Sequence, residues 1–226
     1  MKVLWRVAAV LCFVHIVLML AGYSQQHKPM PGATPAEVVT AYQTGPEVRT
    51  YVGEFIALIA FAVLLAAVPL LSTLLRADRP AAQWLARFAA SAGTTYVALT
   101  VGISFAPAAA AFYLARHGGD PGIVVALDRL GFFGDAASVA TMGLFAIGVG
   151  AATLAGGAMG RWLGWTGLVV GIAAVASVAG VGRGLIDYGQ LVWMIWFVVL
   201  AGAMLRRAGR PAVAPEPVRP LVASAT

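Results

Sequence analysis

Six long and almost uncharged apolar stretches are the feature that most limits how this chain can fold. A helix needs about 20 apolar residues to cross the hydrocarbon core of a bilayer. The stretches are continuous and lack the alternation of a barrel strand, so they predict helices. We therefore predict an all-α polytopic transmembrane helix bundle with six spans. The spans cover roughly residues 7–22, 51–75, 88–106, 131–156, 163–182 and 189–205.

The composition of the chain favours a bilayer environment over water. Hydrophobic residues make up 61% of the sequence and charged residues 11%, and the mean hydropathy is +0.87. Soluble domains carry about 25% charged residues, so a water-exposed surface of the usual kind is excluded. We expect a multi-pass protein of the plasma membrane with membrane lipids as partners. The single cysteine, Cys12, excludes a disulfide within the chain and a cysteine-based metal site.

The distribution of lysine and arginine predicts the orientation of the bundle. With the N-terminus inside, the inner side carries Lys2, Arg6, Arg76, Arg79, Arg87, Arg161, Arg206, Arg207, Arg210 and Arg219. The outer side carries Lys28, Arg49, Arg116, Arg129 and Arg183. The positive-inside rule therefore predicts that both termini are cytoplasmic, N-in and C-in. Because this topology accounts for the net charge of +6, no nucleic-acid partner is expected.

The first apolar stretch has a second interpretation as a signal peptide. Its start is positively charged, and Gly22 and Ser24 are small residues spaced as at a cleavage site. Cleavage would leave five helices without changing the orientation of the others. We favour an uncleaved first helix.

Segments between and after the spans carry local structural signals. In the outer loop 23–50, Thr34, Pro35 and Glu37 have the pattern of a capping box, which predicts a short helix over about residues 35–43. Residues 107–130 leave two alternatives open, because Pro107 interrupts a run of helix-forming residues. The segment is either part of a kinked, tilted span or an interfacial helix after a span. The transmembrane domain covers residues 1–208, and the proline-rich tail 209–226 is predicted to be disordered.

Small residues recur every four positions in the fourth and fifth stretches. They are Gly148, Ala152, Gly156 and Gly160, followed by Gly167 and Gly171. Small residues at this spacing let helix backbones approach closely. They predict close packing of the fourth and fifth helices, either within one chain or in a homo-oligomer formed through Gly148, Gly156, Gly167 and Gly171. We favour packing within the chain, because a short loop joins the two helices.

Five ionisable residues within or beside the spans are the candidate ligand-binding residues, since such groups are costly in a membrane. They are His15, Glu54, Asp135, Arg183 and Asp187. The four charged residues fall at the outer end, where they could form a pocket for a cation, a lipid headgroup or a small polar ligand. In the simpler alternative they are helix-end residues in interfacial water, where a carboxylate at a helix N-terminus gains about 0.3–1 kcal/mol. At the level of sequence this alternative is favoured.

Arg183 and Asp187 lie four residues apart between the last two stretches. The span lengths assign them to an outer turn, RGLIDY at 183–188, and not to the hydrocarbon core. We predict that Arg183 faces Glu54 or Asp135 within about 8 Å. His15 lies deeper and is predicted to form a hydrogen bond between helices.

Missing residues exclude several catalytic and cofactor sites. GISF at 102–105 contains a serine in a pattern similar to that of rhomboid-type proteases, but the last two stretches contain no histidine to act as its base. A bis-histidine haem site needs ligands on facing helices, and of His15, His27 and His117 only His15 lies in a span. No HExxH, P-loop or dinucleotide motif is present. We therefore expect no catalytic residues, no metal ligands and no cofactor.

Two longer segments carry a resemblance to a protein family. They are residues 34–76, beginning TPAEVVTAYQTGPEVR, and residues 131–175, which contain GRWLGW. In these segments the chain resembles an uncharacterised family of bacterial six-span integral membrane proteins, common in actinobacteria, that contains a domain of unknown function. The resemblance implies no activity and no site residues. We expect a protein that binds or transports a small polar or lipidic ligand from the outer side. The alternatives are an intramembrane enzyme that uses the outer carboxylates and a structural or partner-binding subunit.

Overall fold

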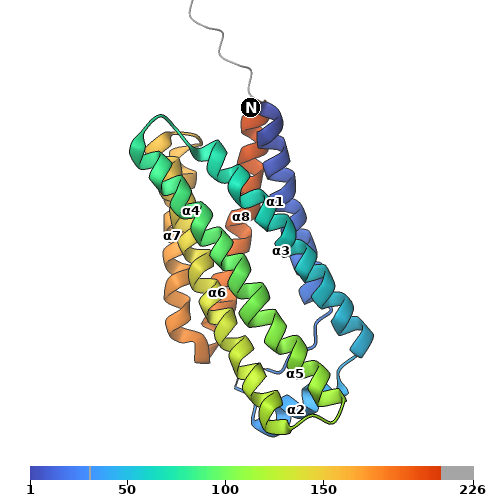
Figure 1. Ribbon diagram of the computed structural model, residues 1–226. Helices are drawn as coiled ribbons and strands as arrows, with labels where there is room; N and C mark the ends of the chain where they lie inside the picture. The colour runs from blue at the N-terminus through green and yellow to red at the C-terminus, as the bar shows by residue number, and fades with distance from the viewer. Residues whose placement is uncertain (31, 210–226) are drawn as a thin grey trace, which may run out of the picture.

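The computed structural model describes residues 1–30 and 32–209, without the side chains of residues 181–183. This part of the chain is built of helices and contains no strand, which confirms the predicted all-α fold (Figure 1). The α-helices are α1 (Lys2–Tyr23), α2 (Pro35–Thr44), α3 (Glu47–Leu75), α4 (Pro80–Leu99), α5 (Ala106–Arg116), α6 (Pro121–Gly156), α7 (Arg161–Ser177) and α8 (Leu185–Gly209). A π-helical segment, η1 (Thr100–Phe105), joins α4 to α5, and a 3₁₀ segment, η2 (Val178–Arg183), follows α7. The predicted tail lies outside the described residues, apart from Gly209.

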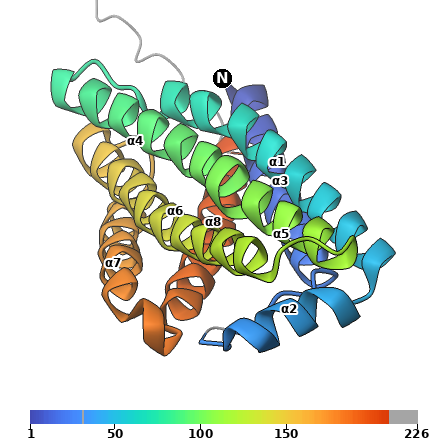
Figure 2. The same cartoon turned by 60° about the horizontal axis from the view of Figure 1, so that its bottom comes forward.

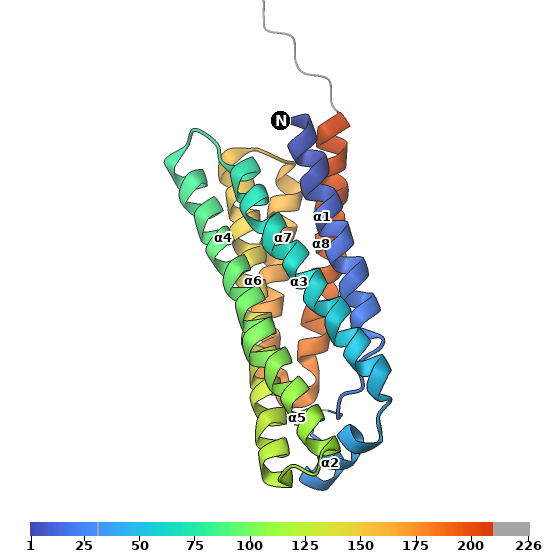
Figure 3. The same ribbon diagram turned by 45° about the vertical axis from the view of Figure 1, so that its right-hand side comes forward.

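Six helical stretches of the described chain are long and apolar enough to cross a membrane, as predicted. They are Lys2–Tyr23, Glu47–Leu75, Pro80–Arg116, Pro121–Gly156, Arg161–Gly180 and Leu185–Gly209. The start of α1 and the end of α8 lie at the same end of the bundle, as an even number of crossings requires (Figures 1 and 3). We call this end the inner end, following the predicted orientation, and the opposite end, where α2 and α5 lie, the outer end.

Two of the helical stretches are much longer than the expected spans 88–106 and 131–156. Pro80–Arg116 has 37 residues and α6 has 36 residues. At 1.5 Å per residue each is about 55 Å long, whereas the apolar core of a bilayer is about 30 Å thick. No break separates residues 107–116 from the third stretch, and the placement of residues 107–130 relative to the interface stays a prediction. Helix α5 continues the third stretch, and α6 begins directly after the turn that follows it.

Helix α2 packs against the outer turns of α5 and α6 and covers the outer end of the bundle (Figure 2). These three elements form a small apolar cluster separate from the main core: Val38, Tyr42, Ala111, Phe112, Ala115 and Val124. The predicted capping box begins α2. The Thr34 hydroxyl accepts a hydrogen bond from the Glu37 N–H at 3.4 Å, and Glu37 Oε2 accepts one from the Thr34 N–H at 2.7 Å. The apolar side of α2 gives the outer turns of α5 and α6 a surface on which to pack.

Glycines set the closest contact between α6 and α7. A Cβ added to Gly171 would lie 2.5 Å from the carbonyl oxygen of Gly143, and one added to Gly150 would lie 2.6 Å from that of Gly164. A Cβ on Gly167 would lie 3.1 Å from Gly150 Cα. The predicted close packing of these two helices within the chain is confirmed.

The other two predicted glycines face different elements. A Cβ on Gly148 would lie 2.9 Å from Ala89 Cα on α4, and one on Gly156 would lie 3.1 Å from Ala77 Cβ after α3. Gly148 and Gly156 therefore do not form the contact between α6 and α7. Helix α6 carries glycines on more than one face, and a four-residue spacing does not tell which face meets which neighbour. A homo-oligomer stays a prediction.

The connection between the last two crossings lies earlier in the chain than expected. Helix α7 ends at Ser177, Gly184 has a φ of +71°, and α8 begins at Leu185. Glycine adopts this left-handed conformation without steric cost. Asp187 consequently lies in the first turn of α8 and not in an outer turn at 183–188. Its carboxylate is stabilised there by the positive end of the helix dipole.

Candidate functional site

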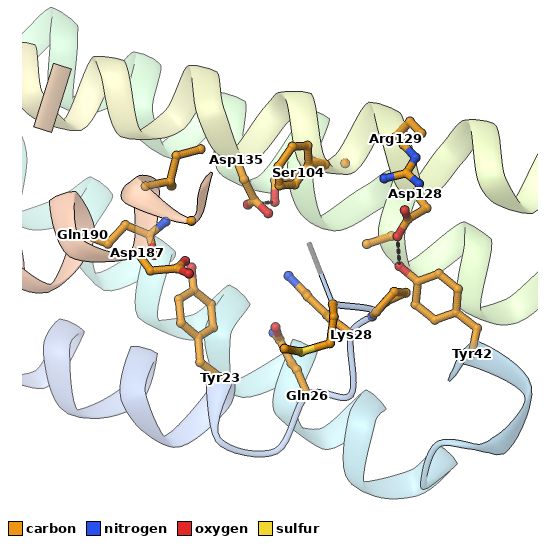
Figure 4. Close-up of a pocket in the computed structure, with 17 residues that line it drawn as sticks. Tyr23, Gln26, Lys28, Tyr42, Ser104, Asp128, Arg129, Asp135, Asp187 and Gln190 are labelled. Atoms are coloured by element: carbon orange, nitrogen blue, oxygen red, sulfur yellow. Dashed lines mark hydrogen bonds between the residues drawn. The ribbon is translucent and has the colours of Figure 1, made fainter. Parts of the chain in front are cut away.

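A polar cavity of about 390 Å³ lies at the outer end of the bundle. Its walls come from the end of α1 and the following loop, from α2, η1, α5 and α6, and from the start of α8 (Figure 4). We call it the outer cavity. Its polar lining residues are Tyr23, Gln26, Lys28, Tyr42, Ser104, Asp128, Arg129, Asp135, Asp187 and Gln190.

The π-helical segment η1 presents a hydroxyl to the first carboxylate of the cavity. The hydroxyl of the buried Ser104 donates a hydrogen bond to Oδ1 of the half-buried Asp135. The backbone widens here, since the Ala106 N–H donates to the carbonyl of Val101, five residues back. Pro107 accounts for this geometry, because it has no N–H and its ring would clash with the carbonyl four residues earlier in a regular α-helix.

Helix α6 approaches η1 at two glycines. A Cβ on Gly134 would lie 2.5 Å from the carbonyl carbon of Ile103, and one on Gly131 would lie 3.1 Å from the carbonyl oxygen of Ser104. Only glycine permits backbones to come this close. Asp135 follows Gly134 directly, so the close approach brings its carboxylate to Ser104.

The second carboxylate of the cavity is held by the outer helix α2. The Tyr42 hydroxyl donates a hydrogen bond to Asp128 Oδ1 at 2.8 Å. Burial of Tyr42, followed by the negative charge and the hydrogen bond of Asp128, raises the pKa of the phenol above its usual range. Tyr42 is therefore a neutral hydrogen-bond donor at physiological pH.

The loop after α1 forms another wall of the cavity and contributes a cation. The Lys28 Nζ lies 5.1 Å from the ring centroid of Phe105 and 5.9 Å from that of Tyr23, within the range of cation–π attraction. Arg129 Nη2 donates a hydrogen bond to the Ala33 carbonyl at 2.6 Å and ties this loop to α6. The Lys28 side chain extends into the cavity from the loop (Figure 4).

Comparison of the chain with protein-family models, with curated proteins and with solved structures finds no match. The resemblance to a bacterial six-span family stays a prediction. The functional interpretation of the outer cavity therefore depends on its own residues.

Two of the five predicted candidates, Asp135 and Asp187, line the outer cavity. Glu54 on α3 is half-buried but is not among the lining residues. The side chain of Arg183 lies outside the described residues. Its approach to Glu54 or Asp135 stays a prediction.

His15 lies in the core and not at the outer cavity. Its Nδ1 is 2.8 Å from the carbonyl oxygen of Ala60, and this contact confirms the predicted hydrogen bond between α1 and α3. Its fully buried ring packs edge-on against Phe61 and Phe197, with centroid distances of 5.4 and 6.0 Å. These contacts account for His15 as a packing residue.

The simpler interpretation, in which the carboxylates are helix ends in open water, does not describe Asp135. Its carboxylate is held by Ser104 at the wall of a cavity. Among the described residues, no group of three or more His, Cys, Asp and Glu side chains is arranged to hold a metal ion. Asp128 and Asp135 are about two turns apart on α6, which separates them by about 10 Å.

Several residues of the site are not predicted by the sequence, including Lys28, Tyr42, Ser104 and Asp128. Lys28, Tyr42 and Asp128 lie outside the expected spans, whereas the predicted candidates are marked by an ionisable group within or beside a span. Ser104 stands out in the sequence only through its likeness to a protease nucleophile. The one useful signal was the capping box, because it predicts the helix that carries Tyr42.

Proposed function

We propose that the chain is a multi-pass protein of the bacterial plasma membrane that binds a small polar ligand with a protonated amine at its outer face. The observation that carries this proposal is the outer cavity, where Asp128, Asp135 and Asp187 line a space of about 390 Å³. Binding sites for small molecules usually measure about 300–1,000 Å³. The predicted orientation makes this end accessible from outside the cell.

The balance of charges in the outer cavity favours a cationic ligand. Its lining contains three aspartates and two basic side chains, and the guanidinium of Arg129 is engaged with the Ala33 carbonyl. A ligand amine would offset the remaining negative charge, whereas a ligand carboxylate would be repelled.

Uncharged polar groups suit the same class of ligand. Tyr23 and Gln190 supply a hydroxyl and an amide to the wall. Gln26 Nε2 is buried without a hydrogen-bond partner in the described chain. An unpaired buried donor costs about 1–3 kcal/mol, and a hydroxyl or carbonyl oxygen of a ligand would remove that cost. Small amino alcohols combine such an oxygen with a protonated amine.

The contact between Ser104 and Asp135 favours a second candidate function, an outward-facing intramembrane hydrolase. Asp135 accepts the hydrogen bond of the Ser104 hydroxyl and is in position to take its proton as a base. A hydrolase of this kind would be labelled covalently on Ser104 by a fluorophosphonate probe. Absence of labelling, or labelling that persists in Ser104→Ala, would contradict it.

Ligand binding is tested with the full chain purified in detergent. Ethanolamine and putrescine serve as amine probes, glycerol as a neutral probe and acetate as an anionic probe, each titrated by calorimetry and by thermal unfolding. We expect the amines to bind and to raise Tm, since a ligand that binds only the folded state stabilises it. Asp135→Asn and Asp187→Asn should each weaken amine binding about tenfold to hundredfold, because each removes a charge-assisted contact.

Asp78→Asn is the matched control, since Asp78 is exposed in the connection between α3 and α4, which lies at the inner end of the bundle (Figure 1). It should leave amine binding unchanged. Preferential binding of acetate, or equal amine binding by all three variants and the unaltered protein, would overturn the proposal. If neither amine binding nor Ser104 labelling is found, a structural or partner-binding role replaces both functions.

A further inference from the structure

A second cavity of about 310 Å³ lies at the inner end of the bundle, between the first turn of α7 and the last turns of α8. We call it the inner groove. Of the described residues that line it, only Arg206 and Arg207 are charged, and both are positive. This separates it from the outer cavity, which is lined by three aspartates. The inner groove is therefore suited to an anion.

Arg207 is held in place by an aromatic ring of another helix. Its guanidinium carbon lies 5.4 Å from the ring centroid of the buried Trp5 on α1. Cation–π contact of this kind orients a guanidinium while leaving its N–H groups free to donate. An arginine in the last turn of a helix also interacts favourably with the helix dipole. That interaction accounts for two arginines at the end of α8, but it does not account for the open groove beside them.

Gly202 accounts for the open part of the groove, and Gly160 leaves the start of α7 without a side-chain cap. A Cβ added to Gly202 on α8 would meet no atom within 4 Å, so this part of the groove is open. Gly160 is the N-cap of α7 and has no side chain to pair with the first N–H groups of that helix. Free N–H groups at a helix start attract phosphate and similar anions. They lie on the same groove as the two arginines.

The remaining wall of the groove is apolar. Leu163 and Val199 line it, and Trp162 is 55% exposed. Tryptophan with this exposure is typical of the membrane interface, where its indole N–H reaches polar headgroups. The groove thus combines a cationic rim with an apolar wall, in the order in which a phospholipid presents its phosphate and its acyl chains.

We propose that the inner groove binds the phosphate of an anionic phospholipid from the cytoplasmic leaflet. Arg206 and Arg207 pair with the phosphate, the N-terminus of α7 donates N–H groups to it, and the exposed Val199 and Trp162 contact the acyl chains. Basic pockets between helices on the cytoplasmic side are a known form of lipid recognition. The site is independent of the proposed amine binding, because it lies at the opposite end of the bundle.

The test measures lipid binding to the full chain in detergent by native mass spectrometry. Phosphatidylglycerol is the anionic probe, phosphatidylcholine the zwitterionic probe and inorganic phosphate the free anion. We expect phosphatidylglycerol to bind about tenfold or more tightly than phosphatidylcholine, because guanidinium–phosphate pairs are among the stronger hydrogen bonds. Inorganic phosphate at the same concentration should not displace the lipid.

Two variants examine the groove separately. R206Q/R207Q should weaken phosphatidylglycerol binding about tenfold or more. Gly202→Leu fills the open space without changing the charge and should weaken it comparably, so the proposal stays testable if the double variant fails to fold. R76Q/R87Q removes two exposed inner-side arginines outside the groove and should bind as the unaltered protein does.

Three results would overturn the proposal. The first is binding of phosphatidylglycerol by R206Q/R207Q or Gly202→Leu at the affinity of the unaltered protein. The second is equal affinity for phosphatidylcholine. The third is displacement of the lipid by inorganic phosphate at the same concentration, which would assign the groove to free phosphate.

Discussion

Hydroxyl donors orient the two carboxylates that α6 contributes to the outer cavity. Tyr42 donates to Asp128, and Ser104 donates to Asp135. A carboxylate that is already oriented needs less reorganisation when a ligand binds, so more of its interaction energy contributes to affinity. The donors come from α2 and η1, two elements that are distant in sequence. Neither element contributes another residue to the lining of the outer cavity.

Removal of the Tyr42 hydroxyl should destabilise the protein and change its behaviour in alkali. Tyr42→Phe leaves the half-buried Asp128 without its donor, and the free energy of unfolding should fall by about 1–1.5 kcal/mol at neutral pH. Because the pKa of Tyr42 is raised in the folded state, its contribution is present below the unfolded pKa of about 10 and is lost as the pH rises beyond it. The variant should therefore lose less stability above pH 10 than the unaltered protein.

Chemical unfolding in mixed micelles at several pH values checks the Tyr42 prediction. Tyr188→Phe is the control, since Tyr188 is exposed on α8 and has no role in the hydrogen bond. Equal alkaline loss of stability in the unaltered protein and in Tyr42→Phe would contradict the prediction.

The capping box makes a separate prediction for α2. Thr34→Ala removes the side-chain cap and should cost about 1 kcal/mol, which raises amide exchange in the first turn of α2 about fivefold. Thr40→Ala, on the exposed middle of the same helix, should have a much smaller effect. Hydrogen exchange followed by mass spectrometry measures both.

The same capping box should respond to acid. Hydrogen bonds from the backbone N–H and the hydroxyl of Thr34 lower the pKa of Glu37. A depressed pKa means that the stabilisation is present above the unfolded pKa and is lost as the pH falls through the folded value. The protection of the amides at the start of α2, corrected for the slower intrinsic exchange in acid, should therefore fall as the pH falls. Glu37→Gln should remove most of this pH dependence.

The close backbone contact between η1 and α6 positions two residues of the outer cavity. The segment η1 widens before Pro107, and α6 approaches it at Gly134. The π-turn and the glycine have no ligand-binding atoms of their own. They matter because they bring Ser104 and Asp135 together from two long helices.

Gly134→Ala tests this positioning role. The added methyl would lie 2.5 Å from the Ile103 carbonyl group, so α6 and η1 must move apart. We expect a loss of about 1–3 kcal/mol in the free energy of unfolding, as overpacking usually causes, and weaker amine binding. Gly202→Ala is the control, because its methyl meets no atom within 4 Å and should leave stability equal or slightly higher. Equal stability of the two variants would contradict the proposed contact.

The whole molecule has a different chemistry at each end. The outer end carries a covered cavity lined by acidic and polar groups, and the inner end carries a groove lined by two arginines and apolar side chains. This asymmetry matches the two surfaces that a plasma-membrane protein meets, the outer medium and an anionic cytoplasmic leaflet. Both proposed functions require the predicted orientation.

Cysteine labelling in intact cells tests that orientation. Thr40 on α2 and Asp78 before α4 are exposed at opposite ends of the bundle, and the native Cys12 is fully buried. A maleimide that does not cross membranes should label Thr40→Cys in intact cells and Asp78→Cys only after lysis. The unaltered protein should stay unlabelled in both cases. The reverse pattern would refute an N-in and C-in arrangement.

Retention of the first helix is a second prediction for the whole molecule. Helix α1 packs against α3 and α8 and buries Trp5, Cys12 and His15. Loss of α1 would expose apolar surface on both neighbours and remove the ring on which Arg207 lies. N-terminal sequencing of the protein from membranes should find the first helix intact, and a start near Gln25 would contradict this.

Several features of this molecule are determined by sequence alone, because the forces behind them act locally. Transfer of an apolar segment into a bilayer depends on that segment, so the six crossings are predictable without knowledge of their neighbours. A capping box involves four consecutive residues, so Thr34 and Glu37 predict the start of α2. The extra length of α5 and α6 is not predictable in this way, since it depends on packing against α2.

The candidate site was decided by tertiary structure. Lys28, Tyr42, Ser104 and Asp187 come from four parts of the chain, and no local pattern relates one to another. The neighbours of the α6 glycines also depend on the tertiary structure, because each face of a helix with small residues can accept a different neighbour. A cavity exists only through the relative positions of packed helices. Those positions follow from shape complementarity over the whole bundle, which a pattern within one segment does not record.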